Sequence, residues 1–259
     1  MAVAHKSAIS VGLIYIPVGL YKSTRDTGVS FNQLCKDTHE RIRYKKYCPS
    51  CIKEVANTDI IKGYEFEKDR YVTISEDELE KIKTKKDKTI HILHFSKMSD
   101  IDQIYFEKNY YVLPEVGGEK AFELFRQALL SQKKVAVAKT VIGTHEELLV
   151  LYPTKESIIA KILFYQEEIQ VMPTAPKVQV DEQEIEMAKM LIDSMTKQFE
   201  PSAYYDEYQQ RLRAAIEQKI EGKEILNVDN TKPANVIDLM DALKKTVEMS
   251  KNHRLPGTA

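Results

Sequence analysis

The hydrophobic periodicity of this chain changes once, near Pro173 and Pro176, and the change separates two kinds of structure. Before it, short apolar runs rich in β-branched and aromatic residues recur at moderate spacing, which is typical of a β-barrel or sandwich. After it, apolar residues recur at the helical spacing of about 3.6. The runs expected to be strands are residues 8–21, 71–74, 89–95, 109–113, 134–142, 148–152 and 158–165. We therefore predict an α+β chain, with a β-rich core followed by helices.

Two helices are predicted between these strands. Ser75 and Glu78 have the spacing of a capping box, so a short helix should follow and end near Lys83. A longer helix should span residues 119–131, after a Gly-Gly pair, and should turn three apolar residues inward: Phe122, Phe125 and Leu129.

Two further apolar stripes at helical spacing follow the prolines and predict a helical arm. The first stripe stops at Pro201 and contains Ile185, Ala188, Leu191, Ile192, Met195 and Phe199. The second ends at Gly222 and contains Tyr205, Tyr208, Leu212, Ala215 and Ile216. A last amphipathic segment, residues 235–250, presents one narrow apolar face of Val236, Met240, Leu243 and Val247. It either packs on its own chain or binds a partner protein.

A basic segment, Arg41 to Lys46, runs directly into a Cys-Pro-Ser-Cys sequence. In a strand, alternate side chains share a face, so Arg41, Arg43 and Lys45 would point to one side and could contact phosphates. The alternative is a solvated edge strand whose cations discourage pairing with other chains.

The three cysteines, Cys35, Cys48 and Cys51, are odd in number and lie in one cluster, which favours a reducing cytoplasm over a disulfide framework. The spacing of Cys48 and Cys51 suits a zinc knuckle, and Cys35 with His39 would complete a structural site of three cysteines and one histidine. The alternative is free thiols in a turn. No catalytic zinc site is indicated.

The net charge of −1 excludes bulk attraction to a polyanion, so any such binding requires segregated charge. Residues 1–60 carry nine Lys or Arg against five Asp or Glu, whereas residues 181–259 carry eleven against fifteen. The N-terminal part of the chain is thus mildly basic and the C-terminal part acidic. No apolar run approaches the roughly 20 residues of a membrane span, and the N-terminus has no signal-peptide core.

In this order, the landmarks resemble the prokaryotic Ku family. The resembling segments are residues 7–18 with Leu20 and Tyr21, 41–46 with 48–51, 59–65, 71–72, 110–114, 136–139, 191–195, 199–201, 205–208 and 236–243. Together they cover nearly the whole chain. The chain departs from the family pattern in two ways. It has Gly143 and His145 where relatives commonly carry arginine or another basic residue, and it has no long Lys-rich tail after the last helix.

The resemblance implies a ring-shaped homodimer that encircles double-stranded DNA at a break, without catalysis and without a required cofactor, and that recruits DNA ligase D in non-homologous end joining. Residues 1–175 would form the Ku-type barrel with inserted strands as a bridge over DNA. Residues 176–222 would form the dimerisation arm, and 223–259 a linker and a partner-binding helix. The protein would act in the cytoplasm, at the nucleoid.

Inward cations of such a ring would contact the sugar-phosphate backbone and would therefore bind without sequence preference. The DNA-contact residues that we predict are Lys22, Arg25, Arg41, Arg43, Lys45, Lys46, Lys133, Lys134, Lys139 and Lys161. Two other classes of protein stay open at this point: a scaffold that binds only proteins, and a zinc-dependent hydrolase, although the carboxylates are scattered on expected helix surfaces.

Overall fold

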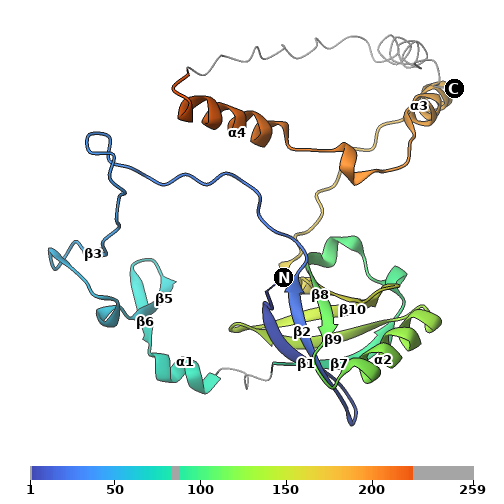
Figure 1. Ribbon diagram of the computed structural model, residues 1–259, viewed down its shortest axis with the longest axis horizontal. Helices are drawn as coiled ribbons and strands as arrows, with labels where there is room; N and C mark the ends of the chain where they lie inside the picture. Colours follow the sequence, from blue (N-terminus) through green and yellow to red (C-terminus); the bar gives the residue numbers. More distant parts are fainter. Residues whose placement is uncertain (1, 83–87, 224–259) are drawn as a thin grey trace. The chain divides into compact units, whose positions relative to one another are not determined.

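Figure 1 shows the computed structural model of the chain, which describes residues 2–82 and 88–223. The chain divides into two compact units. Among the described residues, the first comprises the chain up to Thr27 and Asn32–Val171, and the second comprises Gly28–Phe31 together with residues 172–223. Within the described residues, no helix is long and apolar enough to cross a membrane.

The first unit contains a closed barrel of seven strands (Figure 1), which confirms the predicted β-barrel core. Its order is β1 (His5–Val11), β2 (Ile14–Lys22), β8 (Phe106–Pro114), β11 (Ile158–Leu163), β10 (His145–Pro153), β9 (Val135–Ile142) and β7 (Thr89–Ser96). The β1–β7 pair that closes the barrel is parallel, and the other pairs are antiparallel.

Alternation along each strand separates the barrel interior from its outer face. The predicted run 8–21 is a hairpin, β1–β2, whose turn contains Gly12 at a φ of 58°. Interior positions pair across it, for example Ile9 with Ile16, and both side chains are fully buried. A second apolar cluster covers the outer face of β9, β10 and β11, where Val137 and Val150 pack beneath Ile101 and neighbouring residues.

The helix α2 (Glu119–Gln132) closes one end of the barrel, because its Phe122 and Leu129 belong to the same buried cluster as the barrel interior. Arg126 fixes it there: the guanidinium pairs with Glu123 and donates to the carbonyl oxygen of Thr154, which follows β10, at 2.6 Å. The predicted inward positions Phe122 and Leu129 are therefore confirmed, and Phe125 packs against the same cluster while partly exposed.

The insertion between β2 and β7 forms small local elements. It contains β3 (Tyr47–Cys48) paired with β4 (Lys53–Glu54), β5 (Lys62–Glu67) paired with β6 (Arg70–Ile74), and α1 (Glu76–Ile82). The capping box is confirmed, since Ser75 and Glu78 exchange hydrogen bonds of 2.8 and 3.2 Å. Short 3-10 helices occur in the chain at Asn57–Asp59, Met98–Asp100, Gln103–Tyr105, Gln166–Glu168 and Pro201–Ala203.

In the second unit, α3 (Glu182–Met195) and α4 (Glu207–Ile220) confirm that the arm contains two helices. Both are shorter than their predicted stripes, because α3 ends before Phe199 and α4 begins after Tyr205. Asp181 caps α3 and Asp206 caps α4, each by accepting a backbone N–H. The N–H of Val29 donates to the side-chain oxygen of Gln209 at 3.0 Å, which attaches the segment Gly28–Phe31 to α4.

Candidate functional site

The basic segment from Arg41 to Lys46 is not a regular strand, and the prediction of a strand there was wrong. Arg41 forms one isolated bridge with Leu34, and pairing resumes only at the two-residue strands β3 and β4. Every residue from Arg41 to Tyr47 is exposed. A strand register is strongly specified only where one face is buried, and this segment buries none. The shared face of Arg41, Arg43 and Lys45 is therefore not established.

The cations of this segment differ in their partners. Lys45 is paired with Glu54 at 2.6 Å. Arg41, Arg43 and Lys46 have no ion pair with any other residue that the structure describes. Exposed ion pairs are weak, so Glu54 neutralises Lys45 without preventing it from changing partner. The three unpaired cations are those most available to a polyanion.

Two predicted contact residues, Lys139 on β9 and Lys161 on β11, lie on the outer face of the barrel. Lys139 pairs with Glu146 at 2.7 Å, and this hydrogen bond raises the pKa of the ammonium. Lys161 lies over the rings of Phe106 and Tyr152, at 5.1 and 5.8 Å from their centroids. Cation–π contacts hold an ammonium in place while leaving its charge uncompensated. Lys161 is thus better suited than Lys139 to bind phosphate.

The remaining predicted cations occupy separate places. Lys22 ends β2 at the barrel end opposite α2, whereas Lys133 and Lys134 follow α2 itself. Lys133 adopts a left-handed conformation, φ 52°, as the residue that ends the helix. Arg25 lies in the irregular chain after β2. The barrel cations therefore do not form one continuous patch.

Gly143, one departure from the resembling family, has a structural reason. It lies in the turn between β9 and β10 with a φ of 68°, a conformation that L-residues other than glycine rarely adopt. A basic residue at position 143 would strain the backbone of this turn. His145, by contrast, begins β10 and is exposed.

The structure brings two of the three cysteines together. A hydrogen bond from the backbone of Cys51 lowers the pKa of the Cys48 thiol, and the contact with Cys48 raises the pKa of Cys51. Cys35 instead has a pKa lowered by the side chain of Thr38. Within residues 2–82 and 88–223, no group of three or more His, Cys, Asp or Glu side chains is arranged to hold a metal ion. The set of Cys35, His39, Cys48 and Cys51 is therefore not assembled.

Zinc binding stays a prediction that metal analysis can test. A closed zinc site would give about one zinc per purified chain, and a chelator would lower the melting temperature, because metal-binding energy is folding energy in such sites. Cys48→Ser should remove the metal. Cys35→Ser is the informative comparison, since zinc retained in that variant would exclude Cys35 as a ligand. Metal-free protein of unchanged stability would favour the free-thiol interpretation.

The four residues predicted to bind a partner protein, Val236, Met240, Leu243 and Val247, lie outside the described residues. Of the charged side chains at the barrel end opposite α2, sequence reasoning predicted Lys22 and missed others. Lys108 on β8, which contacts Glu107 at 3.2 Å and Glu147 at 3.6 Å, is one of them. The sequence pattern could have revealed it, because Lys108 lies two residues before Tyr110 and four before Val112, and these two residues point into the barrel.

Comparisons with known proteins agree with this architecture. A family model described as the Ku70/Ku80 beta-barrel domain matches residues 10–187. A protein of Lachnoclostridium phytofermentans named non-homologous end joining protein Ku is 48% identical over 253 residues, which cover 97% of this chain and 98% of that protein. Proteins of the same name from Bacillus subtilis and Archaeoglobus fulgidus are 34% and 35% identical, over 98% and 97% of this chain and 85% and 100% of their own lengths.

Proposed function

This chain belongs to the Ku family, and from that premise we propose that it binds the ends of double-stranded DNA in non-homologous end joining. The observation that carries the proposal is the similarity over nearly the full length to proteins named for that process. Binding is independent of base sequence, because the contacts are made by exposed cations to phosphates. The protein acts in the cytoplasm, on the nucleoid, and catalyses no reaction itself.

The binding form in this proposal is a homodimeric ring. A closed ring holds DNA topologically, so a chain with a net charge of −1 needs only a limited set of inward cations. The exposed apolar side chains of α3, among them Ile185, Ile192 and Met195, support a contact between two copies, since large apolar surfaces on soluble proteins usually mark interaction sites.

The test of this function compares linear and covalently closed circular DNA of the same sequence in gel shifts. A ring that threads from an end binds the linear form and discriminates strongly against the circle, and cutting the circle restores binding. Equal affinity for both forms would contradict end binding. No affinity for either form would favour the alternative of a protein-interaction scaffold, and release of cleaved product would favour the alternative of a zinc-dependent hydrolase.

The proposed partner is DNA ligase D, bound through the C-terminal segment with Val236, Met240, Leu243 and Val247. The charge of this segment is balanced, with Asp238, Asp241 and Glu248 against Lys244 and Lys245, so it does not resemble a DNA-binding tail. Truncation after Asn230 should leave dimerisation and end binding largely intact while reducing stimulation of the ligase in a joining assay. Loss of the dimer on truncation would instead assign this segment to the fold and move the partner surface to the arm, residues 182–222.

A further inference from the structure

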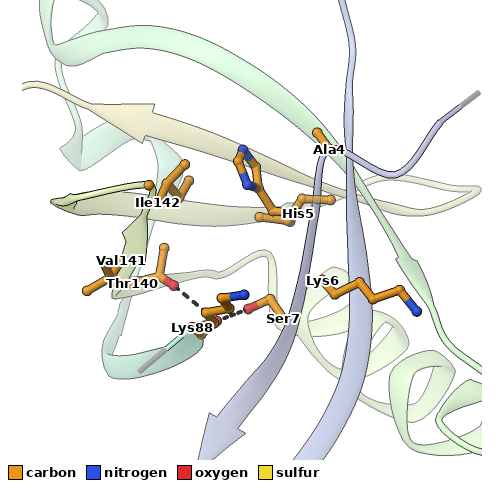
Figure 2. Close-up of a pocket in the computed structure, with 10 residues that line it drawn as sticks. Ala4, His5, Lys6, Ser7, Lys88, Thr140, Val141 and Ile142 are labelled. Atoms are coloured by element: carbon orange, nitrogen blue, oxygen red, sulfur yellow. Dashed lines mark hydrogen bonds between the residues drawn. The ribbon is translucent and has the colours of Figure 1, made fainter. Parts of the chain in front are cut away.

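The two ends of the barrel are different. Whereas α2 closes one end, the other end opens into a pocket of about 500 Å³. Figure 2 shows the side chains around this pocket. The pocket is lined by Ala4, His5, Lys6, Ser7, Leu20, Lys88, Thr140, Val141, Ile142 and Gly143. We call it the barrel mouth.

Interior-facing positions become polar at the barrel mouth. On β1 the buried Ile9 is followed, two and four residues toward the mouth, by Ser7 and His5. Lys22 has the same relation to Leu20 on β2, and Lys108 to Tyr110 on β8. Because alternate residues of a strand point to the same face, these polar side chains continue the interior rows of the barrel. An otherwise apolar barrel therefore ends in a polar, largely cationic rim.

His5 occupies the centre of this arrangement. Its ring packs edge-on against Tyr110, with 5.9 Å between centroids, and is half-buried. Burial lowers the pKa of His5, and the charges of Lys22, Lys88 and Lys108 lower it further. Three ammonium groups from three segments thus disfavour the charged form of one imidazole, which would be protonated more easily if an anion entered.

Carboxylates compensate only part of this charge. Lys6 points away from His5 (Figure 2) and pairs with Glu115 at 3.3 Å, while Lys108 contacts Glu107 and Glu147. Lys22 and Lys88 have no ion pair among residues 2–82 and 88–223. The carbonyl oxygen of Lys88 accepts hydrogen bonds from the hydroxyls of Ser7 and Thr140, which fix this residue at the rim. The barrel mouth therefore holds a surplus of positive charge on an ordered frame.

We propose that the barrel mouth binds a phosphate group, with Lys88 and the imidazole of His5, which line the pocket, as its donors and with Lys22 of the rim as a further positive charge. Converging ammonium groups match the several oxygens and the double charge of a phosphate better than the single charge of a carboxylate. The volume of about 500 Å³ accommodates a phosphate together with an attached nucleoside. The phosphate comes either from a free nucleotide or from a DNA strand, and the second source rests on the proposed function.

The direct test is NMR of the full chain labelled at its histidines, with inorganic pyrophosphate and AMP as probes. His5, one of six histidines, is assigned by loss of its signal in His5→Gln. Pyrophosphate should perturb the His5 signal and raise its pKa, because the bound anion favours the imidazolium. The charged groups that act on the ring are Lys22, Lys88 and Lys108, and Tyr110 packs against it. Glu147 contacts Lys108 at 3.6 Å. Binding should therefore weaken as the pH rises through that pKa.

The variant Lys88→Gln should weaken pyrophosphate binding at least about tenfold, the effect of losing one charged contact. Lys120→Gln is the matched control, since Lys120 is an exposed cation on α2, at the closed end. Unchanged melting temperatures would show that both variants fold. An unperturbed His5 signal at about 10 mM pyrophosphate, or equal affinity in Lys88→Gln and Lys120→Gln, would overturn the proposal.

A short blunt duplex distinguishes the two sources of phosphate. Competition between the duplex and pyrophosphate for the His5 signal would assign the site to a DNA strand, whereas simultaneous binding would assign it to a free nucleotide. Failure of the proposed function has a different signature: the wild-type chain would bind linear and circular DNA equally, and its His5 signal would still respond to pyrophosphate.

Discussion

Replacing both Arg43 and Lys45 with glutamate should lower the affinity for duplex DNA at least about tenfold, and equally for every sequence. Each phosphate contact releases counterions, so the loss of two contacts should also reduce the log–log salt slope by about two units. The reason lies in the segment itself: all of its residues from Arg41 to Tyr47 are exposed, and it buries no face that would commit these cations to the fold. Binding is measured by gel shift at several salt concentrations.

The ion pair between Lys45 and Glu54 makes the prediction more specific. Because Glu54 neutralises Lys45 at 2.6 Å, Arg43→Gln should cost more affinity than Lys45→Gln, and Glu54→Gln should strengthen binding. A matched double reversal, Lys120→Glu with Lys155→Glu, changes the net charge equally at exposed positions outside the predicted contact set. If the Arg43 and Lys45 variant remains a folded dimer with unchanged affinity and slope, the segment does not contact DNA.

Sequence periodicity predicted most of the barrel, because burial imposes it. The strand around Ala136 and Ala138 and the helix carrying Phe122 and Leu129 were both recognised, since each has one face in the core. The segment from Arg41 to Lys46 alternates equally well in sequence but has no core to face, so its pattern carried no structural information. Alternation predicts a strand only where something buries one side of it.

The charged contacts of the candidate site were harder to predict, because they depend on which strands are neighbours. Lys139 was predicted to contact DNA, and the structure shows it paired with Glu146, which the β9–β10 register places diagonally across from it. His5 and Lys88 are 83 positions apart and meet only because the barrel closes through the parallel β1–β7 pair. The pairing of β1 with β7 joins segments far apart in the chain, so it cannot be predicted from the local sequence of either strand.

The largest effect on assembly should come from α3. Ile185 and Ile192 are seven residues apart, on one face of the helix, and are 42% and 64% exposed in the single chain. In a homodimer that covers this face, four isoleucine side chains would be buried, and because each is about half exposed in the single chain, each would contribute about half of the roughly 1.5–3 kcal/mol of a fully exposed side chain. Replacing both with aspartate should therefore weaken the dimer by roughly a thousandfold or more, as measured by sedimentation equilibrium.

The helix supplies its own control. Met190, 57% exposed, lies on the opposite side of α3 from this stripe, so Met190→Asp introduces the same charge on the same helix without entering the predicted interface. That variant should remain a dimer and bind linear DNA normally. The double variant should become a folded monomer, because neither isoleucine belongs to the buried clusters formed by residues 2–82 and 88–223, and its end binding should fall with the dimer. A dimer that survives Ile185→Asp with Ile192→Asp would place the contact between copies on another surface, such as the α4 face with Tyr208.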